Sequence, residues 1–460
     1  MSSILEERCD VIVVGGGPSG VMAAVAAKKS GAEEVLLIER YGFLGGELAS
    51  GLLIHGFFDG EGNQVVYGLA DELINNLKNK YEAAVKIRIS GKEANMLAAI
   101  AVDLEYYKLE LLEMLLNSSV KLMLHTTFLD VLKKRNSLQG IVALSKSGKH
   151  VIPADIIIDC TGDGDVSATA GAKYQIGRDR DKLTQNLTLI FTMQNVNIEE
   201  VVQRMGVAYG KPVDEISKAS RPPYFWCKGT LAPWAEKLKE ENIFPQNANI
   251  EKMGLTMNTF HPNTLNFNAT IAPALYGTDV YDLTKAEIQC RKQVKKYSSF
   301  LIENVLGFKD AYLEKTAFKI GVRETRRITG DYTLSYDDCI KSRSFSDNIA
   351  LGGFFIDIHD PKSEEWLYKP KEGAYPKQAY GIPYRCLLPE GLENIMVAGR
   401  CISAEHEALA SARVVATSMA TGHAAGTAAG LAICDNCSPR KLRVEKLKEQ
   451  LEEQNAMVSY

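Results

Sequence analysis

The apolar residues near the start of the chain form two short runs separated by a helix-length stretch of small residues. Residues 9–40 read CDVIVVGGGPSGVMAAVAAKKSGAEEVLLIER. Short apolar runs on either side of a crossover helix are typical of parallel strands in an α/β sheet. We therefore expect a βαβ unit of about 30 residues here.

Further strands are predicted after this unit. Residues 122–128 have the pattern of a parallel strand, residues 138–151 that of a hairpin, and residues 154–160 that of a buried strand ending in TGDGD. Asp163 and Asp165 of this turn are interpreted as turn and cap residues, because no third carboxylate follows at a spacing suited to a metal ion. No metal site is expected.

The pattern changes between residues 173 and 341. Strand-like runs at residues 186–193 and 264–271 alternate with an amphipathic helix at residues 285–305, and no glycine turn of the phosphate-binding type occurs. This region is predicted to be an α+β substrate or cap domain inserted into the first domain. The first domain then comprises residues 1–172 and a return segment, residues 342–437.

The return segment ends in a strand at residues 393–399 and a helix at residues 412–433 with glycine at every fourth position. A face of small residues can lie against a flat ring or pack tightly on another helix, and the sequence leaves both open. Residues 438–460 are expected to form a charged terminal helix, which either docks a partner or is solvated.

Composition narrows the class of protein. The 460 residues carry a net charge of −4, so nucleic acid is not an expected partner. No run approaches 18 apolar residues and no signal peptide precedes the first strand, which predicts a cytoplasmic protein without a membrane span. The nine cysteines are scattered, as expected in a reducing compartment, and Cys434 and Cys437 are interpreted as a surface turn.

The first turn carries a nucleotide signature. Its glycines would allow the tight turn, the close approach of a pyrophosphate and helix–strand packing, and the helix N-terminus would face the phosphates. A glutamate at the end of the second strand would accept both ribose hydroxyls and repel a 2′-phosphate. The expected contacts are Gly15, Gly17, Pro18, Ser19, Gly20 and Glu39. These residues alone leave FAD and NAD open.

Taken with later motifs, the chain resembles the FAD-dependent oxidoreductase family, flavoproteins of glutathione-reductase-like fold distantly similar to fumarate reductase flavoproteins. The resemblance covers nearly the whole chain and rests on VIVVGGGPSG, GGELASG, DCTGDGD, GVRETRRITGDY, DIHDP, NIMVAGRCISAEHEALASARV and MATGHAAGTAAGLA. It implies a Rossmann-like FAD-binding domain, with a parallel sheet, helices and a β-hairpin layer, and an inserted α+β cap domain.

The resemblance also implies further cofactor contacts. Phe128 would lie beside the adenine, and the last helix would point its N-terminus at the pyrimidine edge of the flavin. The contacts added in this way are Arg40, Gly45, Gly46, Glu47, Phe128, Thr161, Gly162, Gly399 and Arg400. GGELASG lacks a histidine for covalent attachment, so non-covalent FAD is expected. No second complete GxGxxG is present, which leaves the electron donor or acceptor unknown.

The expected activity is hydride transfer between a small organic substrate and flavin N5, with the dehydrogenase direction favoured. Alternatives are an ene-reductase of an unsaturated acid and a flavin subunit that relays electrons within a complex. A homo-oligomer is compatible with each of these three activities.

The catalytic candidates are one histidine and two arginines. His406, between two glutamates, is the candidate acid or base, and His261 and His359 are weaker candidates. Arg323 and Arg326 would hold a substrate carboxylate or oxygen, although such a run can equally be a solvated basic patch.

Overall fold

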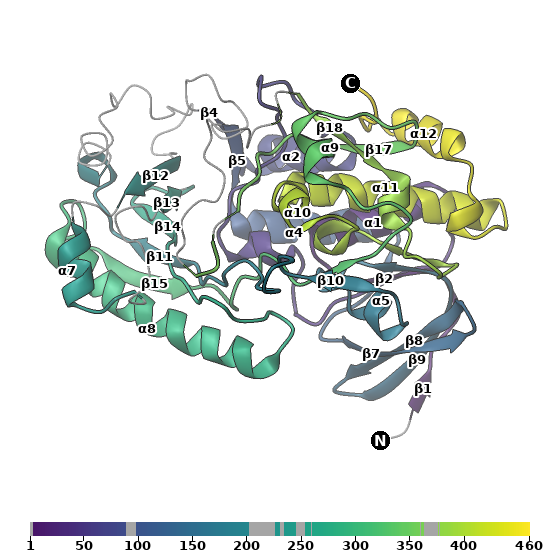
Figure 1. The fold of residues 1–460 in the computed structure, drawn as a ribbon, viewed down its shortest axis with the longest axis horizontal. Helices are drawn as coiled ribbons and strands as arrows, with labels where there is room; N and C mark the ends of the chain where they lie inside the picture. Colours follow the sequence, from purple (N-terminus) through teal and green to yellow (C-terminus); the bar gives the residue numbers. More distant parts are fainter. Residues whose placement is uncertain are drawn as a thin grey trace.

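The computed structural model describes residues 3–88, 98–201, 226–230, 234–244, 254–258, 260–358, 360–362, 376 and 378–460. His359, one of the weaker candidates, lies outside these residues. Within them the molecule has two halves side by side, each with its own hydrophobic core (Figure 1).

The larger half is built on a sheet that has eight strands within the described residues. Six are paired in the order β6 (Lys121–Met123), β3 (Val35–Ile38), β2 (Cys9–Val14), β9 (Gly148–Asp159), β8 (Ser137–Ser145) and β7 (Thr127–Lys134). β1 (Ser3–Leu5) and β19 (Ile395–Val397) both pair with β9. The β6–β3–β2–β9 part is parallel, and β8 and β7 add an antiparallel layer.

Strand β9 joins the two parts of this sheet. Its first half pairs antiparallel with β8, and its second half pairs in parallel with β2 and β19. The expected hairpin arm and the expected buried strand are therefore one strand of 12 residues. The single strand expected at residues 122–128 is wrong: β6 ends at Met123, and His125 turns the chain with a φ of 53° before β7 begins.

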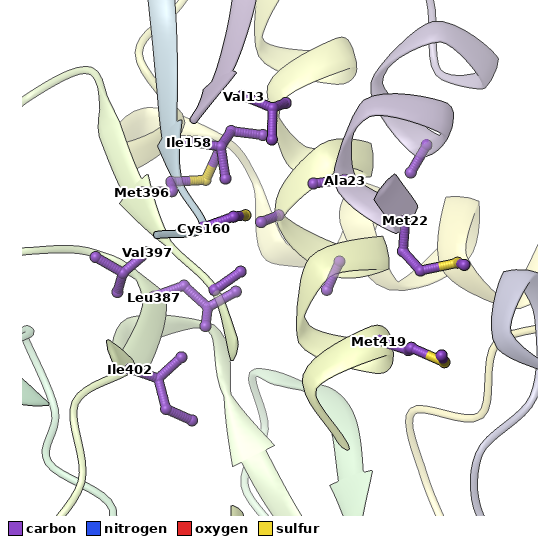
Figure 2. Close-up of a cluster of buried hydrophobic side chains, with 14 of the residues drawn as sticks. Val13, Met22, Ala23, Ile158, Cys160, Leu387, Met396, Val397, Ile402 and Met419 are labelled. Atoms are coloured by element: carbon purple, nitrogen blue, oxygen red, sulfur yellow. The ribbon is translucent and has the colours of Figure 1, made fainter. Parts of the chain in front are cut away.

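Two helices from opposite ends of the chain, α1 (Pro18–Lys29) and α11 (Val415–Cys434), pack on the parallel strands. Figure 2 shows Val13, Ile158 and Met396, from β2, β9 and β19, gathered beside these helices, with Ala23 on α1 and Met419 on α11. All of these side chains are buried.

The glycine face of α11 packs on the backbone of α1. A Cβ added at Gly422 would lie 2.1 Å from the carbonyl oxygen of Ser19, and one at Gly426 would lie 2.1 Å from that of Ala23. Two backbones meet this closely only where one helix has no side chains. Of the two interpretations of the glycine pattern, these contacts support helix packing.

The smaller half holds an antiparallel sheet of five strands within the described residues. Their order is β12 (Trp226–Thr230), β13 (Gly254–Asn258), β14 (Thr264–Asn268), β11 (Phe191–Gln194) and β15 (Tyr312–Thr316). The long helix α8 (Val280–Asn304) covers it (Figure 1). Phe191 and Phe267 stack with ring centroids 4.8 Å apart, and Tyr297 of α8 meets both edge-on.

The two chain crossings between the halves lie side by side, because β10 (Tyr174–Ile176) pairs antiparallel with β16 (Arg326–Ile328). This pairing is compatible with an insertion over residues 173–341, and those boundaries stay a prediction. The smaller half is called the cap below.

The remaining elements belong to the larger half and its border with the cap, except α7 (Ala235–Glu240), which contributes Ala235 and Leu238 to the core of the cap. They are η1 (Gly46–Ser50), α2 (Leu69–Tyr81), β4 (Ala84–Arg88), β5 (Ala98–Val102), α4 (Leu104–Asn117), α5 (Asp165–Thr169), α7 (Ala235–Glu240), α9 (Tyr336–Ile340), β17 (Asn348–Gly352), β18 (Tyr380–Pro383), η4 (Tyr384–Leu387), η5 (Gly399–Cys401) and η6 (Pro439–Lys441).

The C-terminal region differs from expectation in two respects. The helix expected at residues 412–433 begins at Val415, as α11, and an unexpected short helix, α10 (His406–Ala412), precedes it, with the extended residue Val414 between them. The terminal helix α12 (Val444–Glu453) is amphipathic and packs against α11 and β17, with Leu447 and Leu451 fully buried. Its apolar face is thus covered by its own chain. No helix in the described part is both long and apolar enough to cross a membrane.

Candidate functional site

A cavity of about 380 Å³ lies between the two halves. Its wall begins at the glycine turn between β2 and α1, passes the N-terminus of α11, and ends on strands of the cap. Residues from both ends of the chain and from its middle therefore meet around one space.

The glycine turn forms one end of the cavity, where Gly15, Gly17, Pro18 and Ser19 line the wall. Gly15 has a φ of 105°, and a Cβ there would lie 2.5 Å from the carbonyl oxygen of Cys160. No side chain of the described residues caps the first turn of α1, whose N–H groups remain for a ligand. Gly20 does not line the cavity, because it packs on Gly15 as a helix–strand contact requires.

Glu39 stands at the end of β3 and lines the cavity. Its Oε2 accepts a hydrogen bond from the backbone N–H of Gly16 at 2.6 Å, and Oε1 accepts one from that of Tyr41 at 2.9 Å. The carboxylate is thus fixed between two loops with further lone pairs left to accept hydroxyl groups. Arg40 lines the wall next to it.

The second glycine loop packs on the first. Gly46 and Glu47 line the cavity, and Glu47 forms an ion pair with Lys319, which comes from the cap and also lines the wall. Gly45 does not line it, but its N–H donates to the carbonyl of Gly16 at 2.9 Å. This second glycine loop therefore connects the glycine turn at Gly15 to the cap.

The third loop follows β9. Thr161, Gly162 and Arg400 line the cavity, as does Phe128 of β7. Arg400 donates to Asp163 Oδ1 at 2.8 Å, which joins this loop to the return segment. Burial alone would raise the pKa of the Asp163 carboxyl, but the guanidinium of Arg400, with the hydroxyl of Thr325 and the charge of Arg40, lowers that pKa below its ordinary value.

The return segment brings a second helix N-terminus to the cavity. Gly399 does not line the cavity: its φ is 80°, and a Cβ there would lie 2.7 Å from Ser19 Oγ, so it holds the segment against the start of α1. Val414, Val415 and Ser418 at the start of α11 do line it, and no side chain among the described residues caps this helix.

Two helix N-termini without side-chain caps face one cavity and favour an elongated anionic ligand, because N–H groups and helix dipoles attract negative charge. The carboxylate of Glu39 at one end suits a ribose. The residues present therefore fit a dinucleotide that reaches from the glycine turn to α11.

The opposite end of the cavity is formed by the cap and by two loops. Thr188, Asn268 and Thr270 give it a polar strip, in which Thr188 Oγ1 donates to Asn268 Oδ1 at 3.1 Å. Phe354 and Phe355 give it an apolar wall, with centroids 4.4 Å apart. This end has the mixed lining typical of a small-molecule site.

The three neighbouring arginines have different surroundings. Arg323 lines the cavity. Arg326 lies outside its lining and donates to Asp165 Oδ1 at 2.8 Å. Arg327 is buried and forms an ion pair with Glu324. The run is therefore no solvated basic patch.

His406 does not line the cavity either. Its Nδ1 lies 2.8 Å from Glu324 Oε2, and both side chains are buried. Nε2 is buried without a hydrogen-bond partner among the described residues. His261 Nε2 lies 2.8 Å from Asp103 Oδ2, and His261 is also outside the lining. The catalytic roles given to His406 and Arg326 stay predictions.

Sequence reasoning missed several side chains that line the cavity. Of the described histidines, His55 is the one that does so, and its ring centroid lies 5.2 Å from that of Phe354. Arg413 and Asp357 face the cavity with Arg323, and Arg413 Nη2 lies 3.5 Å from Asp357 Oδ2. Arg413 and Asp357 lie within motifs of the resemblance, NIMVAGRCISAEHEALASARV and DIHDP, but nothing in those motifs distinguished them from their neighbours, and His55 lies in none of the motifs. Among the described residues no group of three or more metal-ligating side chains could hold a metal ion.

Comparison with known proteins adds the family. Thiamine thiazole synthase from Methanococcus vannielii is 28% identical over 173 residues, which cover 36% of this chain and 60% of that protein. The chain thus spans less than two thirds of the length of the curated relatives it matches first.

Among solved structures, a geranylgeranyl bacteriochlorophyll reductase-like protein from Thermoplasma acidophilum aligns with a TM-score of 0.48 and 14% identity over 98% of this chain and 84% of the other. The p-nitrophenol 4-monooxygenase from Pseudomonas putida aligns with a TM-score of 0.48 and 10% identity over the same shares. A family model described as FAD dependent oxidoreductase matches residues 10–451. The chain belongs to the FAD-dependent oxidoreductase family, and its cofactor is FAD.

Proposed function

We propose that this flavoenzyme oxidises a small organic substrate held between the N-terminus of α11 and the cap. The observation that carries the proposal is the continuity of one cavity from the glycine turn at Gly15 to Thr188 and Asn268 of the cap. FAD, when bound, supplies a hydride acceptor or donor at its N5 atom. A cavity that continues beyond the cofactor residues favours an enzyme over a subunit that only relays electrons.

The chain's own residues would bind and enclose the substrate. The start of α11, which has no side-chain cap, favours negative charge at its end of the cavity through the helix dipole. Thr188 and Asn268 offer polar contacts from the cap, and Phe354 and Phe355 exclude water.

A proton must also move when a C–H bond is oxidised to a double bond. In this proposal an imidazole nitrogen of His55 exchanges it, because His55 lines the cavity. The sequence favours His406 for this role instead. Because its Nδ1 is hydrogen-bonded to Glu324, His406 would hold the proton at a position outside the cavity.

The test is a spectral one. The protein is purified anaerobically, its flavin is released by denaturation to identify FAD, and the visible band is followed with a panel of donors and, after dithionite reduction, of acceptors. Bleaching by one donor supports oxidation. Reoxidation by an unsaturated acid, with no bleaching by any donor, would reverse the direction to that of an ene-reductase. A protein that does not bind FAD, or whose flavin responds to no substrate, refutes the proposal.

His55→Gln and His406→Gln separate the two proton carriers. Loss of a general base lowers the reduction rate by about 10²–10⁴-fold. We expect this loss, and the loss of one limb of the pH–rate profile, in His55→Gln with FAD content unchanged. The same loss in His406→Gln alone would transfer the role to His406.

A further inference from the structure

We infer that the cap end of the cavity binds a carboxylate of the substrate through Arg323 and Arg413. This inference rests on the proposed function and names the class of substrate: a carboxylic acid with a small apolar or aromatic body. Arg413 was not identified from the sequence, and Arg323 was one of several candidates there.

Arg323 is a cation that keeps most of its donors unused within the described part of the chain. Its Nη1 donates to the carbonyl oxygen of Asn186 at 2.6 Å. Among the described residues, no carboxylate lies within ion-pair distance of its guanidinium, although it lines the cavity. A guanidinium carries five N–H donors in a fixed fork, which matches the two oxygens of a carboxylate.

Arg413 is held loosely by its surroundings. Its Nη2 lies 3.4 Å from Gln185 Oε1, 3.3 Å from the backbone oxygen of Asp357 and 3.5 Å from Asp357 Oδ2, all at the long limit for such bonds. Its Nε is buried and has no partner among the described residues. A buried donor of a charged group that lacks a partner is costly, and a ligand that accepts from it removes that cost.

The two guanidinium groups also act on each other. Burial lowers the pKa of Arg413 to about 10, the carboxylate of Asp357 opposes this, and the charge of Arg323 lowers the pKa further. Among the described residues, Asp357 is the one carboxylate within ion-pair distance of these two guanidinium groups, so the pair keeps one uncompensated positive charge. A bound carboxylate monoanion would neutralise it, whereas a phosphate dianion would leave a buried negative charge.

The neighbouring wall indicates the rest of the substrate. Phe354, Phe355 and Val414 form a small buried cluster beside Arg413, and all three line the cavity. Aromatic and aliphatic side chains bind an apolar body by removing it from water. The charged guanidinium groups suit one carboxylate, and the aromatic wall beside them suits an apolar group attached to it.

The experiment measures binding by calorimetry, with FAD-loaded protein, so that no turnover is needed. The probes are acetate, butyrate and benzoate, with benzamide as the neutral counterpart of benzoate and phenyl phosphate as the competing anion. The variants are Arg323→Met, Arg413→Met and Arg413→Lys. Arg291→Met is the matched control, because Arg291 lies on α8, pairs with Glu287 and does not line the cavity.

We expect the protein to bind benzoate at least 10-fold more tightly than benzamide. Each Met variant should weaken benzoate binding by about 10- to 100-fold, the range for one charge-assisted hydrogen-bonded contact, and leave benzamide unchanged. Arg413→Lys keeps the positive charge but loses the planar pair of N–H donors, so its benzoate affinity should lie between those of the wild type and Arg413→Met. Arg291→Met should behave as the wild type.

Several outcomes would overturn the inference: no binding of any carboxylate, equal binding of benzoate and benzamide, tighter binding of phenyl phosphate, or carboxylate preference retained in both Met variants. If a Met variant fails to fold, Arg413→Lys and the benzoate-to-benzamide ratio of the wild type still decide. Carboxylate preference without redox turnover of any acid would retain this inference and refute the proposed reaction. Turnover of a neutral substrate without carboxylate preference would retain the proposed reaction and refute this inference.

Discussion

Gly422→Ala tests whether the packing of α11 on α1 shapes the cofactor site. The added Cβ would lie 2.1 Å from the carbonyl oxygen of Ser19, whereas ordinary contact begins at 3.4 Å. The helices must therefore separate locally until that contact is restored. Overpacking of this kind costs about 1–3 kcal/mol, against about 1 kcal/mol gained from the higher helix propensity of alanine. Because the clash is with backbone, which cannot rotate away, we expect a cost near the upper limit and a net loss of stability of about 1–2 kcal/mol.

The displacement occurs at Ser19, in the first turn of α1 that lines the cavity. Loss of one charge-assisted hydrogen bond to the cofactor phosphates costs about 1.5–3 kcal/mol, so FAD should bind roughly 10- to 100-fold more weakly. Gly426→Ala is the matched control, since its Cβ would meet Ala23 at the same 2.1 Å, one turn further from the cavity.

Both variants are assayed by urea unfolding and by titration of deflavinated protein with FAD. We expect similar losses of stability and a much larger loss of FAD affinity in Gly422→Ala. Helix propensity alone predicts that both variants are stabilised. Unchanged or increased stability in both would therefore refute the close backbone contact, and equal FAD affinities would refute its link to the phosphate turn.

Three further predictions concern the cofactor, pH and the terminal helix. Glu39→Ala leaves the N–H of Gly16 unpaired and removes the ribose acceptor, so FAD should bind at least about 10-fold more weakly in a fluorescence titration; unchanged affinity would contradict this. Burial lowers the pKa of His423 to about 4 from 6.5, so the unfolded chain takes up a proton first as pH falls. From pH 6.5 to 4 the wild type should lose up to about 3 kcal/mol relative to His423→Gln in urea unfolding, and parallel curves would contradict this. Leu451→Ala should cost about 2–5 kcal/mol in the same assay if α12 packs on α11; a cost below about 1 kcal/mol would indicate a solvated helix.

The sequence predicted best where local patterns decide the structure. The βαβ unit follows from spacing within the single stretch 9–40, and the structure confirms it; its glycine turn and Glu39 line the cavity, and their contacts to the cofactor stay predictions. From sequence, the glycines of α11 indicated only that a flat ring or another helix lies close to this face of the helix. Whether a ring or a helix backbone does so depends on the approach of α1, which comes from the opposite end of the chain.

The catalytic residues were predicted less well, because burial is a tertiary property. His406 was noticed for the two glutamates beside it, yet its partner is Glu324, 82 residues earlier in the chain. His55 and Arg413 have no charged neighbours to mark them, and they reach the cavity because their loops are carried there by other elements. Spacing between neighbours in sequence carries no information about such convergence.

The break between α10 and α11 links the fold to the chemistry. Val414 is extended, with a ψ of 157°, between Arg413 at the end of α10 and the 20 residues of α11. In a helix that continued from α10 into α11, the N–H groups of residues 415–417 would bond to carbonyls of the preceding turn. Here the N–H of Ala416 donates to the carbonyl of His55 at 3.3 Å, and only from Ser418 onward do the N–H groups bond within the helix. One extended residue opens that turn, so the dipole of a long helix ends in the cavity instead of inside a longer helix. The same residue turns α10 away and leaves Arg413 at the cavity wall, where a cation can hold a substrate next to the helix end.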